Sequence, residues 1–257
     1  MSTAMPLNRA AANAASDAAE WTLHASGERL LIVELQAKDR VAANRRARDF
    51  AARIGAENLP YISDIVPAMT TVGIHYSPSR VPLVREGQAP YEALVETLNR
   101  LLASVAVSQS AAARVVEIPV CYGGEHGPDL EDVARACGLS VAEVIELHSG
   151  ALVDVMMLGF APGHPYIGMF DEQLSPARRA TPRTAVAAGS IGLANRQTVI
   201  YPLTLPGGWN LIGRTPLTLF DPAREAPCLV DAGDQIRFVP ITPAQFDTLS
   251  PTTGVQR

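Results

Sequence analysis

The stretch from Gly159 to Pro216 constrains the fold of this chain more than any other. It holds eight of the chain's 19 Gly and seven of its 20 Pro within 58 residues. Glycine adopts backbone conformations that other residues avoid and proline fixes φ, so this stretch cannot form long helices. It is also rich in Ile, Val, Leu, Tyr and Trp, which argues against a disordered linker. We therefore expect short strands joined by specified turns, with the functional site among those turns.

Charge is distributed unevenly along the chain. The Gly159–Pro216 stretch carries five Arg and two acidic residues, a local charge of +3, whereas the whole chain carries −5. A net negative charge argues against nucleic acid or an anionic membrane as the main partner. The local excess of Arg favours a small anionic ligand, because guanidinium groups bind carboxylate and phosphate well.

The composition sets further bounds. No apolar run reaches the length of a membrane span. The three Cys are widely spaced and form no Cys/His cluster, so we expect neither structural zinc nor another metal site. The N-terminus lacks a basic segment followed by an apolar core, so no secretory signal is expected and we predict a cytoplasmic protein.

The pattern of apolar residues predicts two domains. Residues 1–27 are Ala-rich and are interpreted as a mobile extension. Residues 28–108 alternate strand and helix signals (strands at 30–36 and 69–76, helices after Asp39 and from Pro90), which is typical of a small α+β sandwich. A linker is expected at 109–113. Residues 114–245 begin with a strand at 115–121, two short helices and a strand at 151–158. Only strand and turn signals follow, down to residue 241, which predicts a mainly β barrel or sandwich.

Several segments resemble one bacterial family. They are GFAPGHPYIG, ATPRTAVAAGSIGLA, QTVIYP and PGGWNLIGRTPLTLFDP, together with YGGEHGPDLEDVA and AGDQIRFVPI. The sequence is similar, from about residue 28 to 242, to the B subunit of 5-oxoprolinase, also known as PxpB, KipI or allophanate hydrolase subunit 1, and to a carboxyltransferase subdomain of urea carboxylases. The resemblance implies a cyclophilin-like β-barrel for residues 114–245. Asn195 and Val199 depart from the family pattern, which has Gly at both positions; Asn tolerates the left-handed conformation, whereas Val does not.

The resemblance also implies an activity. Its members form one subunit of a heteromeric ATP-dependent 5-oxoprolinase, an amide hydrolase that opens 5-oxoproline to glutamate. The family implies two partners, a C subunit of the KipA type and an A subunit, with ATP and Mg²⁺ shared between them and this chain. This sequence has no P-loop of its own, which fits a protein that needs partners and is expected to be inactive alone. Lys38 lies in QAKDR, so biotin attachment to this chain is not expected.

Two other functions remain open at the level of sequence. The same family includes an inhibitor of a sporulation histidine kinase, in which case the barrel would be a regulatory binding module. It also includes urea- or allophanate-type carboxyltransferase subunits, which require a biotin carrier elsewhere.

Three residues are catalytic candidates. Glu125 and His126 share the Gly-rich turn GGEHG, where a carboxylate beside an imidazole could act as a general acid and base; a plain turn before a helix is the alternative. His164 lies between Pro and Gly residues that would hold it rigidly, in a role that could be proton transfer, stacking or shape.

Six residues are candidates for binding substrate or an anion. Arg183 and Arg214 each lie between turn residues, where an Arg could bind a carboxylate or could instead tie loops together through backbone carbonyls. Trp209 could present a flat apolar surface or anchor the core. The remaining candidates offer polar hydrogens: Gln197, Tyr201 and Thr215.

Overall fold

The computed structural model describes residues 21–104 and 113–250 of the chain. By its internal contacts the chain divides into two compact units, Met1–Ala111 and Ala112–Arg257. The predicted linker at 109–113 lies outside the described residues except for its last residue.

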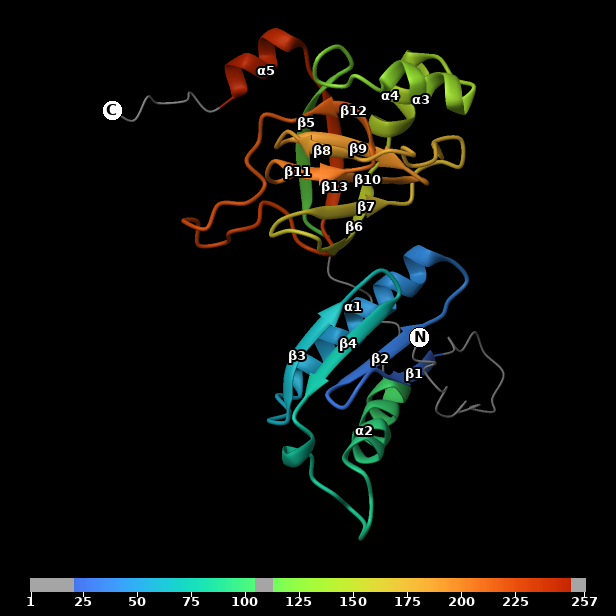
Figure 1. Ribbon diagram of the computed structural model, residues 1–257, viewed down its shortest axis with the longest axis vertical. Coiled ribbons are helices and arrows are strands. Elements are labelled where there is room, and N and C mark those ends of the chain that lie inside the picture. The colour runs from blue at the N-terminus through green and yellow to red at the C-terminus, as the bar shows by residue number, and fades with distance from the viewer. Residues whose placement is uncertain (1–20, 105–112, 251–257) are drawn as a thin grey trace. The chain divides into compact units, whose positions relative to one another are not determined.

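The first unit is a four-stranded antiparallel sheet with two helices (Figure 1). The strand order is β1-β2-β4-β3, so β1 and β3 are the edges of the sheet. The elements are β1 (Trp21–Ala25), β2 (Leu30–Leu35), α1 (Arg40–Ala56), β3 (Ile62–Pro67), β4 (Thr71–Tyr76), the 3-10 turn η1 (Pro78–Arg80) and α2 (Pro90–Ser104).

One core joins the sheet to both helices. Side chains alternate between buried and half-buried along β2 and β4, so one face of the sheet is covered. Phe50 of α1 and Leu94 of α2 are fully buried in the same cluster as Val33 of β2. Asp39 begins α1 as predicted, since its carboxylate accepts from the backbone N–H of Ala42 at 2.8 Å.

The N-terminal boundary drawn from the sequence requires a correction. The predicted extension ran to residue 27, but β1 begins at Trp21 and pairs with β2, with Trp21 opposite Leu35. The indole N–H of Trp21 also donates to Asn99 at 2.9 Å. The Ala-rich composition concealed the strand, because the apolar segment WTLHA is short and its partner lies in the next strand. Residues 1–20 lie outside the described residues.

The second unit is a closed seven-stranded barrel, in the order β10-β7-β6-β13-β5-β12-β9 (Figure 1). The predicted mainly β part is therefore a barrel rather than a sandwich. Only β5 and β13 pair in parallel; the other neighbours are antiparallel. The barrel strands are β5 (Val115–Tyr122), β6 (Val153–Leu158), β7 (Pro165–Gly168), β9 (Ser190–Ala194), β10 (Gln197–Ile200), β12 (Asn210–Arg214) and β13 (Gln235–Pro240).

Five further elements surround the barrel. A separate two-stranded sheet pairs β8 (Arg183–Val186) with β11 (Leu205–Gly207). Helices α3 (Leu130–Cys137) and α4 (Val141–Ser149) lie side by side, and their apolar faces join the barrel core. A capping box of Ser140 and Glu143 is present at the start of α4. Helix α5 (Pro243–Leu249) was not expected from the sequence.

The two departures from the family pattern fit the barrel. Ala194 of β9 pairs with Gln197 of β10, so Asn195 and Arg196 are the two turn residues of this hairpin. Their φ angles are 50° and 65°. The expectation that Asn keeps this turn is confirmed. Val199 is an ordinary, fully buried strand residue of β10.

Candidate functional site

One buried carboxylate binds two arginines of the Gly/Pro-rich stretch. Asp129, at the start of α3, is 5% exposed in its side chain. Arg183 donates to both of its oxygens, at 2.9 and 2.8 Å, and Arg179 donates at 2.9 Å. The backbone N–H of Leu211 donates at 2.7 Å, and the Asp129 N–H donates back to the Leu211 carbonyl. This arginine–aspartate cluster ties α3, β8 and β12 together.

The electrostatics of this cluster follow from its geometry. Burial alone raises the pKa of Asp129, but the hydrogen bonds from Arg183 and Leu211 and the charges of Arg183 and Arg179 outweigh it, so the pKa is lowered. The Asp129 carboxylate in turn raises the pKa of Arg183. Asp129 is ionised at neutral pH, and the planar fork of Arg183 faces it. Anion binding by Arg183 stays a prediction, in which a ligand would share this guanidinium with Asp129.

A cluster of rings lies at the barrel strands β7, β10 and β12. It consists of Phe160, His164, Tyr166, Tyr201 and Trp209, and we call it the aromatic cluster. The imidazole of His164 lies 5.1 to 5.4 Å from the three rings of Phe160, Tyr166 and Tyr201, and Tyr166 lies 6.2 Å from Trp209. Three of the sequence candidates therefore meet in one place.

Two polar atoms of the aromatic cluster are buried without a hydrogen-bond partner. They are Nδ1 of His164 and the hydroxyl of Tyr201, both in side chains that are 1% exposed. Burial lowers the pKa of His164 to about 4, so the imidazole is neutral at pH 7. Burial raises the pKa of Tyr201 to about 12, so the phenol keeps its proton. The backbone N–H of Trp209 lies near the hydroxyl and opposes this rise, without hydrogen-bond geometry.

The arginine–aspartate cluster and the aromatic cluster adjoin each other. The guanidinium of Arg178 lies 4.5 Å above the ring of Trp209, within the range of a cation–π contact. The charges of Arg178 and Arg183 both act on the hydroxyl of Tyr201. Arginine, phenol and imidazole groups therefore lie close together. As a set they can bind an anion, or donate to and accept from a planar amide.

The two adjacent catalytic candidates lie against α5 instead. The imidazole of His126 is tilted over the ring of Phe246 at 4.2 Å, and the guanidinium of Arg214 lies 5.9 Å from the same ring. The Glu125 carboxylate is 88% exposed and lies 3.9 Å from Nε2 of His126. Nε of Arg214 donates to the Ala188 carbonyl at 2.8 Å, as in the loop-tying alternative. Catalysis by Glu125 and His126 stays a prediction.

Two further candidates are accounted for within the barrel. Gln197 opens β10, opposite Gly168 of β7 and Ala194 of β9. Thr215 is 2% exposed, and its hydroxyl accepts from the N–H of Leu217 at 3.3 Å. Their roles in binding stay predictions.

A third histidine, His148, lies in the barrel core. His148 of α4 contacts the Tyr122 hydroxyl through Nδ1 at 2.7 Å and the Thr198 hydroxyl through Nε2 at 2.9 Å. Its ring stacks on Phe170 at 4.8 Å. Burial lowers its pKa to about 3 and raises that of Tyr122. Both ring nitrogens have partners, so the group is a satisfied structural histidine.

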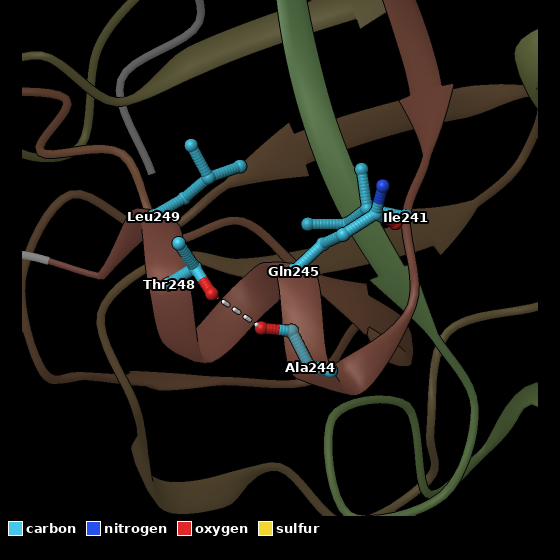
Figure 2. A pocket seen from close by; sticks show the side chains of 5 residues that line it. All are labelled: Ile241, Ala244, Gln245, Thr248 and Leu249. Atoms are coloured by element: carbon cyan, nitrogen blue, oxygen red, sulfur yellow. Dashed lines mark hydrogen bonds between the residues drawn. The ribbon is translucent and has the colours of Figure 1, made fainter.

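A surface pocket of about 350 Å³ lies beside α5 (Figure 2). Within it the Thr248 hydroxyl donates to the Ala244 carbonyl at 2.9 Å. None of the sequence candidates lines this pocket; its lining residues are Ile241, Ala244, Gln245, Thr248 and Leu249.

The sequence did not identify Asp129 or Arg178 as site residues. Asp129 directly precedes α3, where an acidic residue is common because of the helix dipole, yet its side chain makes no cap bond. Its partners lie 50 to 82 residues away in the chain, so no local pattern reveals them. Arg178 carries a weak signal only, as one of two adjacent Arg before Pro182.

The described residues limit the class of site in two respects. Within residues 21–104 and 113–250, no three His, Cys, Asp or Glu side chains converge in a way that could hold a metal ion. In the same residues, no helix is both long enough and apolar enough to cross a membrane.

Comparison with known proteins identifies the family. Residues 21–230 match the family described as carboxyltransferase domain, subdomain C and D. The chain is 41% identical over 198 residues to the 5-oxoprolinase B subunit of Bacillus subtilis (strain 168), covering 76% of this chain and 82% of that protein. It is 41% identical over 214 residues to the 5-oxoprolinase B subunit of Escherichia coli O157:H7, covering 83% and 93%.

A solved structure supports the same relationship. The crystal structure of TTHA0988 aligns with a TM-score of 0.69 and 36% identity over 83% of this chain, which spans 40% of that longer chain. Matches of this extent, from strand β1 to beyond the site, establish that the chain belongs to the carboxyltransferase domain, subdomain C and D, family.

Proposed function

We propose that this chain is the B subunit of a heteromeric ATP-dependent 5-oxoprolinase, which opens 5-oxoproline to glutamate. The observation that carries the proposal is the 41% identity to two proteins named as 5-oxoprolinase B subunits, over 82% and 93% of their lengths. Neither alternative considered from the sequence, the kinase inhibitor or the carboxyltransferase subunit, is favoured by these relatives.

The chemistry explains why such an enzyme needs several parts. A lactam carbonyl accepts water poorly, and phosphorylation of its oxygen by ATP makes it a better electrophile. We propose that ATP and Mg²⁺ are held jointly with partner subunits, because the described residues of this chain form no metal cluster. The partners are a C subunit of the KipA type and an A subunit, and the chain alone is inactive.

The geometry of the site supports a substrate-facing role for this protein. Arg179 and Arg183 place two positive charges on a single buried carboxylate, and Arg178 adds a third on the ring of Trp209, so the region retains an excess of positive charge. Its neutral imidazole and protonated phenol can accept from and donate to an amide. 5-Oxoproline presents both a carboxylate and an amide.

The proposal is tested with purified subunits. We expect glutamate to form from 5-oxoproline, ATP and Mg²⁺ when this chain is mixed with its candidate A and C partners, and little or none with this chain by itself. The exposed ion pair of Arg135 and Asp132 on α3 offers a control variant, Arg135→Gln, expected to keep full turnover. An assembled, well-folded mixture that makes no glutamate would contradict the assignment.

A further inference from the structure

The loop that precedes β7 holds an exposed aromatic ring in a strained conformation. Phe160 has φ of 73° and is 64% exposed. For a bulky residue a positive φ is a strained outlier that persists only where the surroundings impose it. The loop is closed by two hydrogen bonds, from Gly159 N–H to the His164 carbonyl and from His164 N–H to the Ala161 carbonyl. Burial of the ring does not offset the strain, because most of the ring faces solvent.

Phe160 contacts a histidine that belongs to a pair of side chains with unpartnered hydrogen-bonding groups. Its ring contacts the imidazole of His164 edge-on, with centroids 5.4 Å apart. His164 carries the unpartnered Nδ1, and next to it Tyr201 carries an unpartnered hydroxyl; the two rings are 5.4 Å apart and nearly perpendicular. A buried polar group without a partner destabilises the folded state, so two in contacting side chains require an explanation.

The third component is the guanidinium of Arg178. Arg178 is exposed, stacks on Trp209 at 4.5 Å and has no carboxylate partner among the residues that the structure describes. By contrast, Arg179 and Arg183 both donate to Asp129. Trp209, on whose ring Arg178 lies, belongs to the same buried cluster as Tyr201, and the charge of Arg178 acts on the Tyr201 hydroxyl.

We propose that Arg178, Tyr201 and His164 form a binding subsite for a small planar amide that carries a carboxylate, with Phe160 as its movable cover. Arg178 pairs with the carboxylate, the Tyr201 hydroxyl donates to the amide oxygen, and Nδ1 of neutral His164 accepts from the amide N–H. Phe160 turns outward to admit the ring and then packs on its face. The identification of this ligand as 5-oxoproline rests on the proposed function.

The test compares two ligands that differ only in the carboxylate, 5-oxoproline and 2-pyrrolidinone. Their binding to the purified chain and to the assembled complex is measured by calorimetry, without ATP. In Arg178→Gln we expect 5-oxoproline to bind at least about tenfold more weakly, because a charge-assisted contact is lost, and 2-pyrrolidinone to bind as before. In Tyr201→Phe we expect both ligands to weaken by a similar factor, about fivefold or more.

The controls separate this subsite from other effects. Arg135→Gln removes an exposed Arg elsewhere in the same unit and should change neither affinity. Phe160→Ala, whose truncated side chain faces solvent, should keep the fold and weaken both ligands. The subsite is overturned if Arg178→Gln leaves the ratio of the two affinities unchanged, or if neither the chain nor its complex binds 5-oxoproline.

The outcome also distinguishes the subsite from the proposed function. If the complex produces glutamate and Arg178→Gln leaves its KM for 5-oxoproline unaltered, the subsite fails while the function stands. If the complex produces no glutamate but the two ligands bind in the expected pattern, the function fails while the subsite stands.

Discussion

At the scale of single residues, the carboxylate of Asp129 organises the site region. It accepts four hydrogen bonds, three from Arg179 and Arg183 and one from the backbone of Leu211. Because the group is buried, each of these bonds replaces water that the carboxylate has lost. The arrangement holds β8 and β12 in a fixed position relative to α3, and so positions the loops that carry Arg178 and Trp209.

Removal of this carboxylate should therefore be costly. We expect Asp129→Ala to lower the free energy of unfolding by about 2–4 kcal/mol, since two guanidinium groups and one backbone N–H lose their acceptor. Denaturant titration measures the change. Asp132→Ala, on the same helix and 65% exposed in its pair with Arg135, should cost less than about 1 kcal/mol. Equal losses in the two variants would contradict the role assigned to Asp129.

The buried imidazole of His164 predicts a pH dependence of stability. Its pKa is about 4 in the folded chain and about 6.5 in an unfolded one, so the unfolded state binds more protons between these values. The stabilisation is fully present above pH 6.5 and is lost as the pH falls toward 4. Between pH 7 and pH 5 this group alone should remove about 2 kcal/mol of stability.

His164→Phe tests this expectation, because it keeps an aromatic ring and removes the titrating group. The free energy of unfolding, measured by denaturant titration at pH 7 and pH 5, should fall by about 2 kcal/mol less in the variant than in the parent protein. An unchanged difference between the two pH values would show that His164 does not carry this effect.

At the scale of elements, the position of strand β11 depends on the close approach of its backbone to the buried side chain of Tyr201. A Cβ at Gly207 in β11 would lie 1.9 Å from the Tyr201 hydroxyl and 2.7 Å from the adjoining ring carbon. Tyr201 is fully buried and cannot move aside cheaply. The next residue, Gly208, has only ordinary contacts of 3.6 Å or more around the same position.

These two glycines form a matched pair. We expect Gly207→Ala to destabilise the protein by about 1–3 kcal/mol through overpacking, and Gly208→Ala to change stability by less than about 1 kcal/mol. Thermal unfolding of both variants measures the difference. A Gly207→Ala protein as stable as Gly208→Ala would mean that Tyr201 is not packed against β11 as described.

The helix caps are local and were predictable. Ser140 accepts from Glu143 N–H, and the Glu143 carboxylate accepts from Ser140 N–H at 2.7 Å. Ser140→Ala should lower the unfolding free energy by about 1 kcal/mol, measured by denaturant titration. Glu143→Gln, which preserves a capping-box acceptor, should retain most of it. A loss in Glu143→Gln as large as in Ser140→Ala would argue against the Ser140 cap.

Local capping signals of this kind also show which elements can be predicted from the sequence and which cannot. Residues 242–245 (TPAQ) carry the same kind of capping signal. The few apolar residues that follow are too short a run to form a helical stripe, so the sequence pattern alone does not predict α5. By contrast β1 and β3 are edge strands that each pair with one neighbour, β2 and β4, and neither shows a local signal strong enough to separate it from a loop.

At the scale of the whole molecule, the density of Gly and Pro predicted short strands joined by turns, and the resemblance predicted the barrel itself. Of the candidate residues, His164, Tyr201 and Trp209 meet in one cluster. His126 and Arg214 lie against Phe246 of α5 instead, and Glu125 is exposed beside His126. Asp129 and Arg178 were missed, because closure of the barrel brings together residues that are far apart in the chain. Spacing in sequence carries no information about such contacts.

The central claim is the proposal that this chain acts only within an assembly, so the most direct measurement is an omission experiment. Glutamate and phosphate release are followed together, from 5-oxoproline, ATP and Mg²⁺, in a mixture of this chain with its A and C partners. We predict equal amounts of both products and the loss of glutamate formation when this chain is left out. Glutamate formed at the same rate without this chain, or ATP hydrolysis that never yields glutamate, would contradict the assignment.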